Sequence, residues 1–241
     1  MNSGVIPPGI WAIIPAAGVG RRMKLQQPKQ YLQFQQHPVI VHSIRAVARS
    51  GPLRGILVGL SADDSWWTGM TGLEELPCPL VPFEGGAERA DTVLLGLKQI
   101  HQLPDTEHDW VLVHDAVRPL VRKQDIENLI STVANHADGG LLALPVADTL
   151  KREQDGCSVE TVDRSRLWRA LTPQYFPATR LRDALEQCQR DSVAVTDEAS
   201  AMEHIGAHPR LVAGHADNIK ITFPSDLQLA EALYQQQRMN E

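Results

Sequence analysis

Three basic side chains follow a glycine-containing turn near the start of the sequence. The run PAAGVGRRM spans residues 15–23, and PKQY follows at 28–31. Together they place Arg21, Arg22 and Lys29 within nine positions. Small residues let backbone N–H groups approach an anion closely, and nearby cations add attraction for phosphate. The sequence therefore predicts a phosphate site, with a tight turn bearing exposed cations as the alternative.

The glycine pattern narrows the kind of phosphate ligand. A dinucleotide-binding turn carries a third glycine, but the run that begins at Gly18 and Gly20 ends in Met23. The eight-residue Walker pattern of P-loop proteins is also absent from the sequence. A nicotinamide cofactor is therefore disfavoured, whereas a nucleoside triphosphate held by a looser basic loop is not.

One carboxylate stands where a metal ion could join such a triphosphate. Asp115 directly follows the apolar run Trp110–His114, which predicts a strand. Ligands of open α/β sheets bind at the carboxyl ends of strands. Mg²⁺ is usually held by one or two carboxylates together with substrate phosphates, so Asp115 is a candidate metal ligand. An Asp that only caps the next helix is the alternative.

The overall charge argues against another class of phosphate partner. The chain has 23 basic and 29 acidic side chains, a net charge of −6, and proteins that bind nucleic acid generally carry an excess of Lys and Arg. We therefore expect no nucleic-acid partner, and cations only in local clusters. The three cysteines form no C-x-x-C pair and the nine histidines show no metal-ligand spacing, so no zinc or redox centre is expected.

Length and hydropathy bound the organisation of the chain. A length of 241 residues fits one large domain, or a domain with a modest excursion. No window approaches the roughly 20 apolar residues of a membrane span, and the N-terminal apolar run lacks the features of a secretory signal. Few and scattered cysteines suit a reducing compartment. We expect a cytoplasmic protein with no membrane partner.

Short apolar runs alternate with helical periods along the chain. Several runs are continuously apolar, which is typical of strands buried on both faces of a parallel sheet. The runs are Ile10–Ile14, Gly55–Leu60, Leu80–Phe83, Trp110–His114, Gly140–Leu144, Leu211–Val212 and Ile219–Thr222. Apolar spacings of three and four predict helices over 40–47, 93–100, 126–133 and 181–188, and a last helix follows Pro224. This order predicts an α/β fold with a Rossmann-like, doubly wound, mostly parallel sheet.

One polar segment interrupts this alternation. Between Asp148 and Leu171, the pair Asp155-Gly156 is a strong signal for a two-residue hairpin turn. The flanks are mostly polar and charged, and an isolated two-stranded ribbon is only marginally stable in water. The hairpin must therefore lean on another surface, which is either a second copy of the chain or its own domain.

Eight sequence motifs, in order, resemble those of one enzyme family. They are PAAGVGRRM with PKQY, GGAERADTV from Gly85, HDAVRP from His114, DTLKR from Asp148, TVDR from Thr161, ALTPQ from Ala170, TDEAS from Thr196 and DNIKIT from Asp217. Together they cover nearly the whole chain and resemble the 2-C-methyl-D-erythritol 4-phosphate cytidylyltransferases of the non-mevalonate isoprenoid pathway. One motif alone would indicate only the wider nucleotidyltransferase superfamily.

The resemblance implies a reaction and an assembly. The expected reaction is Mg²⁺-dependent transfer of CMP from CTP to 2-C-methyl-D-erythritol 4-phosphate, with release of pyrophosphate. The expected organisation is one nucleotidyltransferase domain over residues 1–241, with 148–171 as a projecting β-hairpin dimerisation arm. In the family this arm reaches the partner subunit's active site, so we expect a homodimer with a shared site.

Residue roles follow from the same match of motifs. Arg22 and Lys29 match the cations that stabilise the α-phosphate in the transition state, and Arg164 and Lys220 match those that hold the acceptor for attack. Further matches on the acceptor side are Asp115, Arg118, Thr149 and Thr172. Matches on the CTP side are Ala16, Ala17, Gly18, Gly86, Thr92 and Asp115. A threonine near a strand end, such as Thr172, is also a common partner of the backbone.

Two positions depart from the family pattern, and two other functions stay open. Ala87 stands where the family often has a polar or acidic residue, so any role there passes to the backbone. Thr92 replaces the usual Ser but keeps the hydroxyl, so we expect its contact to survive.

The alternatives are a cytidylyltransferase for another polyol phosphate, such as ribitol 5-phosphate, and a non-catalytic nucleotide-binding module. The intact set of charged candidates argues against the second.

Overall fold

Seven strands form one central sheet in the order β11-β7-β10-β6-β1-β4-β5. The computed structural model describes residues 8–18 and 27–239. The strands are β1 (Ile10–Pro15), β4 (Gly55–Leu60), β5 (Leu80–Glu84), β6 (Trp110–Val113), β7 (Gly140–Pro145), β10 (Trp168–Pro177) and β11 (Arg210–Ala213). Only β10 runs antiparallel to its neighbours, β6 and β7. The predicted mostly parallel sheet is confirmed.

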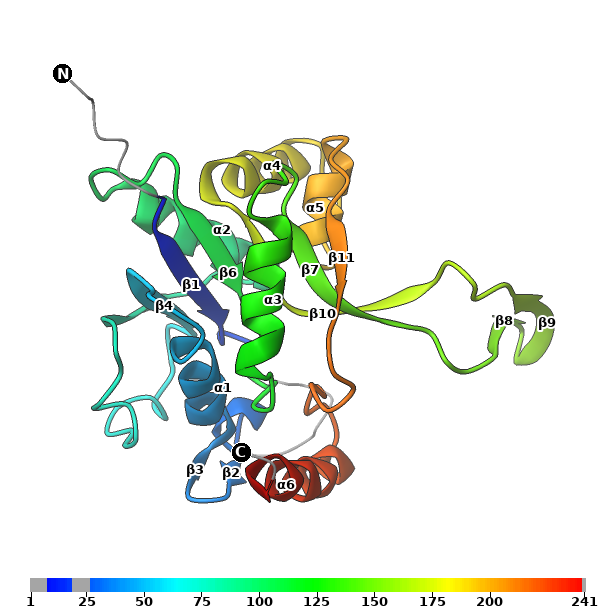
Figure 1. Cartoon of the computed structure of the whole chain (residues 1–241), viewed down its shortest axis with the longest axis horizontal. Helices are drawn as coiled ribbons and strands as arrows, with labels where there is room; N and C mark the ends of the chain where they lie inside the picture. The colour runs from blue at the N-terminus through cyan, green and yellow to red at the C-terminus, as the bar shows by residue number, and fades with distance from the viewer. Residues whose placement is uncertain (1–7, 19–26, 240–241) are drawn as a thin grey trace.

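Helices cover both faces of this sheet (Figure 1). α1 (Val39–Ala48) and α3 (Lys123–Val133) contribute to the apolar cluster on one face. α2 (Arg89–His101), α4 (Ala178–Arg190) and α5 (Glu198–His204) contribute to the cluster on the other. Within the described part of the chain, no helix is long and apolar enough to cross a bilayer.

A third, smaller apolar cluster includes residues of α6 (Pro224–Met239), the helix drawn below the sheet in Figure 1. The cluster includes Phe34 of β2 (Gln33–Phe34), which follows the short 3-10 turn η2 (Lys29–Tyr31) in the chain and pairs with β3 (His37–Pro38) in a small separate sheet. Phe34 is fully buried there and packs edge-on against Tyr234 of α6.

The strand β1 shows why the apolar runs are continuous. Ile13 and Ile14 are both fully buried, although adjacent side chains of a strand point to opposite faces. Ile13 belongs to the cluster with α2 and α4, and Ile14 to the cluster with α1 and α3. The doubly wound arrangement predicted from these runs is confirmed.

One predicted strand is wrong. Residues 219–222 belong to no strand, although the Ile221 N–H donates to the Val117 carbonyl over 2.9 Å. The alternating pattern arises because Ile219 and Ile221 pack into the cluster with α6 while Lys220 points away, into an ion pair with Asp115. One-sided burial of an extended segment produced the pattern of a strand without a sheet.

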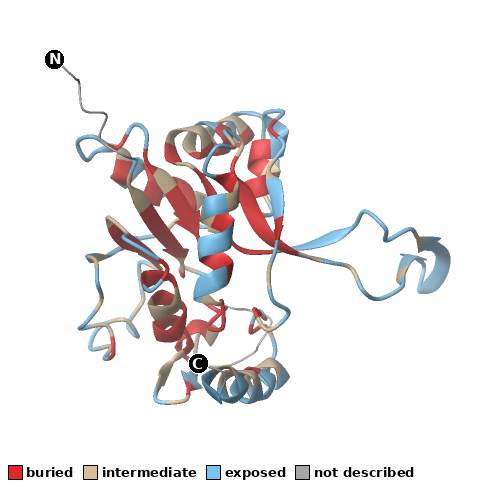
Figure 2. Ribbon diagram, in the orientation of Figure 1, coloured by how far each residue is buried: buried red, intermediate tan, exposed pale blue. Residues whose placement is uncertain are grey.

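The polar segment forms a hairpin that projects from the body (Figure 1). β8 (Leu150–Gln154) and β9 (Cys157–Val162) make a separate two-stranded sheet, which we call the arm, and nearly all of it is exposed (Figure 2). Asp155 and Gly156 both have positive φ, 52° and 78°, so the predicted turn is confirmed. Residues 168–171, which the prediction placed in the arm, begin β10, where Trp168 pairs with Pro145 of β7.

Candidate active site

Two adjoining cavities lie at the carboxyl ends of β1 and β6. The glycine-loop cavity, of about 230 Å³, is lined by residues 15–18, 29–30, 86–89 and 115–117, with Thr92 and Lys220. The β10 cavity, of about 300 Å³, is lined by Arg89, Asp115, Arg118, 170–172, Gln174, Thr196, Asp197 and Lys220. Arg89, Asp115 and Lys220 border both, so these three side chains stand between them.

Larger hollows elsewhere carry none of the predicted site residues. Cavities of about 560 and 640 Å³ border α1, and Arg45 and Arg49 lie on both. Neither contains any candidate from the motifs. The chemistry-bearing residues, rather than the volume, identify the site.

The glycine-loop cavity brings together eight predicted residues from distant parts of the chain: Ala16, Ala17, Gly18, Lys29, Gly86, Thr92, Asp115 and Lys220. The turn that carries Lys29 is held by its neighbours. Gln30 Nε2 donates to the Ala16 carbonyl over 2.8 Å, and the Tyr31 hydroxyl donates to Asp64 over 2.7 Å. Gln30, to which the sequence assigned no role, therefore ties the lysine turn to the glycine loop.

The second turn of this cavity is shaped by Thr92. Its hydroxyl accepts a hydrogen bond from the Gly86 N–H over 3.0 Å and donates to the Glu88 carbonyl over 3.2 Å. A Cβ on Gly86 would collide with Asp91, so the close approach requires glycine. Thr92 is 1% exposed and acts here on the protein backbone. Its direct contact with a nucleotide stays a prediction.

Asp115 is the electrostatic centre of the site. Its carboxylate is 2.9 Å from Lys220 Nζ and 3.3 Å from Arg118 Nε through Oδ2, and 3.1 Å from Arg89 Nε through Oδ1. Burial alone would raise the pKa of this carboxyl group, but the three cations outweigh burial and hold the pKa far below its ordinary value. Asp115 is therefore ionised at neutral pH although its residue is only 6% exposed.

Arg118 has two fixed partners. Besides Asp115, it donates through Nη1 to the Asn218 carbonyl over 2.7 Å. This bond connects the loop after β6 to the extended segment that carries Lys220. Burial lowers the pKa of Arg118, and the Asp115 charge opposes that effect.

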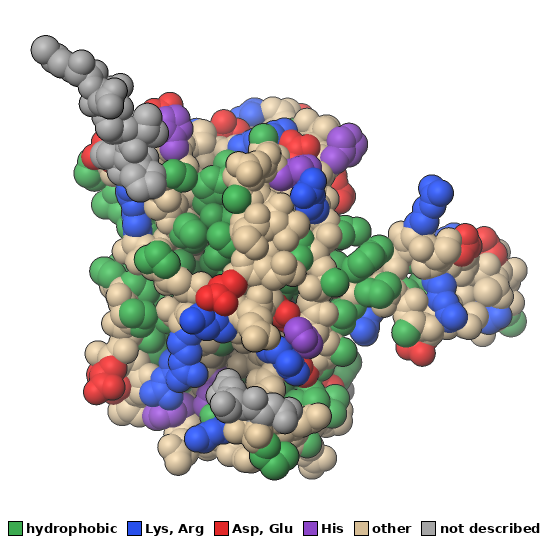
Figure 3. Space-filling model, in the orientation of Figure 1, with side chains coloured by type: hydrophobic (Ala, Val, Ile, Leu, Met, Phe, Trp, Pro, Cys, Tyr) green, Lys and Arg blue, Asp and Glu red, His purple; other side chains and the backbone are tan. Residues whose placement is uncertain are grey.

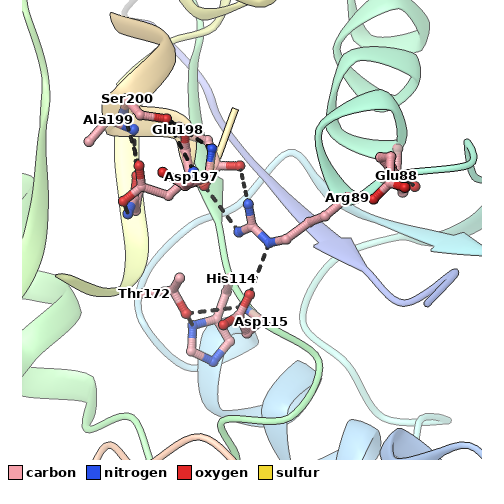
Figure 4. A network of polar contacts seen from close by, with 12 residues as sticks. Glu88, Arg89, His114, Asp115, Thr172, Asp197, Glu198, Ala199 and Ser200 are labelled. Atoms are coloured by element: carbon pink, nitrogen blue, oxygen red, sulfur yellow. Dashed lines mark hydrogen bonds and ion pairs between the residues drawn. The ribbon is translucent and has the colours of Figure 1, made fainter. Parts of the chain in front are cut away.

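Thr172 and His114 form a buried pair behind Asp115 (Figure 4). His114 Nε2 lies 3.0 Å from the Arg118 carbonyl, which can only accept, so Nε2 carries the proton and Nδ1 accepts from the Thr172 hydroxyl over 3.0 Å. The same hydroxyl accepts from the Asp115 N–H over 3.1 Å. Burial lowers the pKa of His114 to about 4, so its ring is neutral. Thr172 lines the β10 cavity but donates to protein, and its acceptor contact stays a prediction.

Two charged residues that the sequence did not single out complete the network. Arg89 Nη1 and Nη2 donate to the two carboxylate oxygens of Glu198 over 2.6 and 3.1 Å, while Arg89 Nε faces Asp115 (Figure 4). Glu198 is 1% exposed. Both residues lie inside motifs already noted, GGAERADTV and TDEAS, and an ionisable residue at the start of each helix is the signal that could have marked them.

Two predicted residues lie apart from these cavities, and a third lies outside the described part of the chain. Arg164 and Thr149 sit at the base of the arm, where Arg164 Nη1 donates to Thr149 Oγ1 over 3.4 Å, and both are exposed. Neither borders the two cavities of its own chain, and the arm stands clear of the body (Figure 3). Arg22 lies outside the described residues.

Comparison with known proteins assigns the family. The family model for 2-C-methyl-D-erythritol 4-phosphate cytidylyltransferase (IspD) matches residues 10–236. The chain belongs to the IspD family. It is 47% identical over 228 residues to the enzyme of that name from Acidithiobacillus ferrooxidans, covering 93% of this chain and 95% of the relative. It is 46% identical over 222 residues to the one from Pseudomonas entomophila, covering 92% and 94%.

Solved structures of the family have the same fold. A 4-diphosphocytidyl-2C-methyl-D-erythritol synthase superimposes with a TM-score of 0.81 at 36% identity, over 95% of this chain and all of that one. The IspD of Francisella tularensis gives 0.76 at 31% identity, over 92% and 98%. The resemblance inferred from the eight motifs is confirmed. The chain is a cytidylyltransferase of the IspD type, which uses CTP and methylerythritol phosphate in the non-mevalonate pathway.

The described side chains of this IspD chain could bind Mg²⁺ through one carboxylate, that of Asp115. Among the described residues there is no cluster of three or more His, Cys, Asp or Glu side chains that could hold a metal alone. Asp115 offers one ionised carboxylate between the two cavities, and its Oδ1, which accepts from Arg89 Nε, has a second lone pair. A single carboxylate completed by phosphate oxygens and water is a usual environment for Mg²⁺.

Proposed function

We propose that the two cavities divide the reactants, with CTP in the glycine-loop cavity and methylerythritol phosphate in the β10 cavity. An oxygen of the acceptor phosphate forms a bond to the α-phosphorus of CTP, and the bond from that phosphorus to the bridging oxygen of pyrophosphate breaks. The phosphate monoester is already ionised near pH 7, so no protein nucleophile or general base is required. Positioning and charge stabilisation therefore dominate catalysis.

Cations from several segments serve this transfer. Lys29 on the wall of the glycine-loop cavity, together with Arg22, stabilises the charge that develops at the α-phosphate. Lys220 borders both cavities and is 39% exposed, so its ammonium can turn from Asp115 to the acceptor phosphate. The position of Asp115 and Lys220 between the two cavities is the observation that carries the proposal.

Asp115 would hold Mg²⁺ together with phosphate oxygens of CTP. When bound, the ion neutralises part of the triphosphate charge. The carboxylate is prepared for this role because it is ionised and held from two sides by Arg89 and Arg118.

The arm completes the acceptor side of a second subunit. Thr149 and Arg164 cannot line the cavities of their own chain in the observed position, yet they match residues that contact the acceptor. Leu167 and Trp168, next to the arm, are 37% and 40% exposed, and exposed apolar side chains together favour a protein contact. We call the glycine-loop cavity and the β10 cavity together the cleft. A homodimer in which each arm reaches the partner's cleft explains both observations.

One assay tests the proposal. The pure protein is incubated with CTP, Mg²⁺ and methylerythritol phosphate, and the products are identified by mass. Pyrophosphate and 4-diphosphocytidyl-2-C-methyl-D-erythritol are expected, and no pyrophosphate would overturn the proposal. Competition with ribitol 5-phosphate tests the acceptor, since preference for that unbranched substrate would refute the choice. Size measurement in solution tests the dimer.

A further inference from the structure

Glu198 controls which nitrogen of Arg89 faces the cleft. The carboxylate engages both terminal nitrogens of the guanidinium, and in this orientation Nε donates to Asp115 (Figure 4). A bidentate carboxylate fixes a guanidinium in one plane more strictly than a single hydrogen bond does. The orientation of Arg89, and through it the position of Asp115 Oδ1, thus depends on Glu198.

The charge of Glu198 also limits what Arg89 can bind. Arg89 borders both cavities and its side chain is 29% exposed, so without a fixed partner it could turn toward a phosphate in either one. Arg89, Arg118 and Lys220 carry three positive charges against the two negative charges of Asp115 and Glu198, a net charge of +1. Loss of the Glu198 charge would raise this to +2 and free Arg89 from its plane.

Glu198 itself is held from the strand β10. Gln174 Oε1 accepts from the Ala199 N–H over 2.8 Å, and Gln174 Nε2 donates to Asp197 Oδ2 over 2.9 Å. Asp197 Oδ1 accepts from the Ser200 N–H over 2.9 Å, which closes the first turn of α5. A continuous set of bonds therefore runs from β10 through Glu198 and Arg89 to Asp115.

We propose that Glu198 is a positioning residue for CMP transfer, which acts by orienting Arg89 and thereby fixing Asp115 between the two cavities. Arg89 and Asp115 line both cavities, whereas Glu198 is not among the described residues that line either one. Glu198 therefore acts on the reactants only through Arg89. This inference rests on the proposed division of CTP and acceptor between the cavities.

The substitution Glu198→Gln removes the charge and keeps the size. We expect kcat to fall about 10- to 100-fold, the usual loss when a group that orients a ligand-binding side chain is removed. The Kd for CTP, measured by calorimetry without acceptor, is expected to stay within about twofold or to become tighter, because the cleft gains positive charge. Glu186→Gln is the matched control: Glu186 pairs with Lys98 over 3.2 Å on the surface, and this variant should behave as wild type.

A double-substitution cycle separates orientation through Arg89 from any other effect. If Glu198 acts only through Arg89, then Arg89→Met and Arg89→Met/Glu198→Gln have the same kcat within about twofold. A further tenfold loss in the double variant would overturn the proposal. An unchanged kcat in Glu198→Gln, or a loss confined to CTP binding, would overturn it as well.

Thermal unfolding of each variant accompanies the kinetics. If Glu198→Gln alone does not fold, the comparison of Arg89→Met with the double variant still decides, since both lack the guanidinium that Glu198 neutralises. Wild-type turnover is measured first. Its absence refutes the proposed function, whereas normal wild-type turnover with an unaltered Glu198→Gln variant refutes only the positioning role.

Discussion

The cleft and the arm carry residues with proposed roles in one reaction, and the two sets lie in opposite physical settings. In the cleft, Asp115 is 6% exposed and contacts three cations within 3.3 Å, and the pair behind it, His114 and Thr172, is buried. At the base of the arm, Arg164 and Thr149 are exposed and share one long hydrogen bond of 3.4 Å. Folding of one chain thus fixes the cleft, whereas nothing in the described part of that chain, residues 8–18 and 27–239, fixes the arm residues around a substrate.

The contrast is between side chains that are fixed before a substrate binds and side chains that are not. A buried network is preorganised, because its charges and hydrogen bonds are set before substrate arrives. Exposed long side chains lose conformational freedom only when a surface receives them. Substitutions should therefore act on chemistry and stability in the cleft, and on assembly-dependent activity in the arm.

The largest expected effect is on the cleft side, at Lys29. We expect Lys29→Ala to lower kcat about 100- to 1000-fold while the Kd for CTP changes much less, because the ammonium acts mainly on the transition state. Steady-state kinetics together with direct CTP binding measure the two quantities. Lys123→Ala, an exposed lysine of α3 that pairs with Glu127, is the control. Equal losses in kcat and binding would contradict a transition-state role.

The next prediction concerns activity in a dimer that combines a cleft variant with an arm variant. Lys29→Ala and Arg164→Ala chains are each expected to be nearly inactive as homodimers. In a mixed dimer, one site combines an intact cleft with an intact arm, so a random equimolar mixture should recover about one quarter of wild-type activity. Co-expression with two affinity tags isolates the mixed dimer. An inactive mixed dimer would refute a shared site.

The next expected effect is smaller: a lower pH should reduce the free energy of unfolding of the domain. Burial lowers the pKa of His114 and of His42 to about 4, whereas both titrate near 6.5 when unfolded. The unfolded chain therefore binds more protons below pH 6.5, and the stability that is fully present above this pH is lost as pH falls toward 4. Each residue should remove about 1.4 kcal/mol of unfolding free energy per pH unit. Denaturant titrations at pH 7 and 5 measure this.

A substitution gives the control for the acid effect. His42→Gln should flatten the pH dependence, whereas His108→Gln, at an exposed position, should leave it unchanged. The same slope in both variants would show that burial of His42 does not set the acid response.

The smallest expected effect is on the stability of the arm. Thr149→Ala and Arg164→Ala should each change the free energy of unfolding by less than about 0.5 kcal/mol, because both side chains are exposed. Arg118→Ala, which leaves a buried carboxylate with one partner fewer, should cost several times more. Comparable losses at the two sites would remove the distinction between a fixed cleft and a free arm.

The sequence predicted the elements whose burial is uniform. β4 and β6 are continuously apolar because helices cover both faces, and the helices of the body repeat apolar residues on one side. β10 was not predicted, because its first three residues are exposed and the next six are buried, so no single period describes it. α5, with seven residues, is too short to show a helical period.

From the sequence, the site residues could be predicted only where they belong to a recognisable motif. Residues next to the glycine loop and after β6 could be named because a strand end is a known place for ligands. The contact between Arg89 and Glu198 could not, since 109 positions separate them and only the docking of α5 on β10 brings them together. The neutral state of His114 likewise depends on burial that no local pattern encodes.

The arm also poses a problem of aggregation. A two-stranded ribbon away from the body leaves backbone groups free on its edges, and such edges can pair with strands of other molecules. β8 and β9 carry charged side chains, with Arg152 and Glu160 paired across the strands at 2.7 Å and Lys151 bonded to Thr161 at 2.6 Å. Charged edge residues oppose stacking of further strands. The same side chains that leave the arm without a core of its own thus protect it from fibre formation.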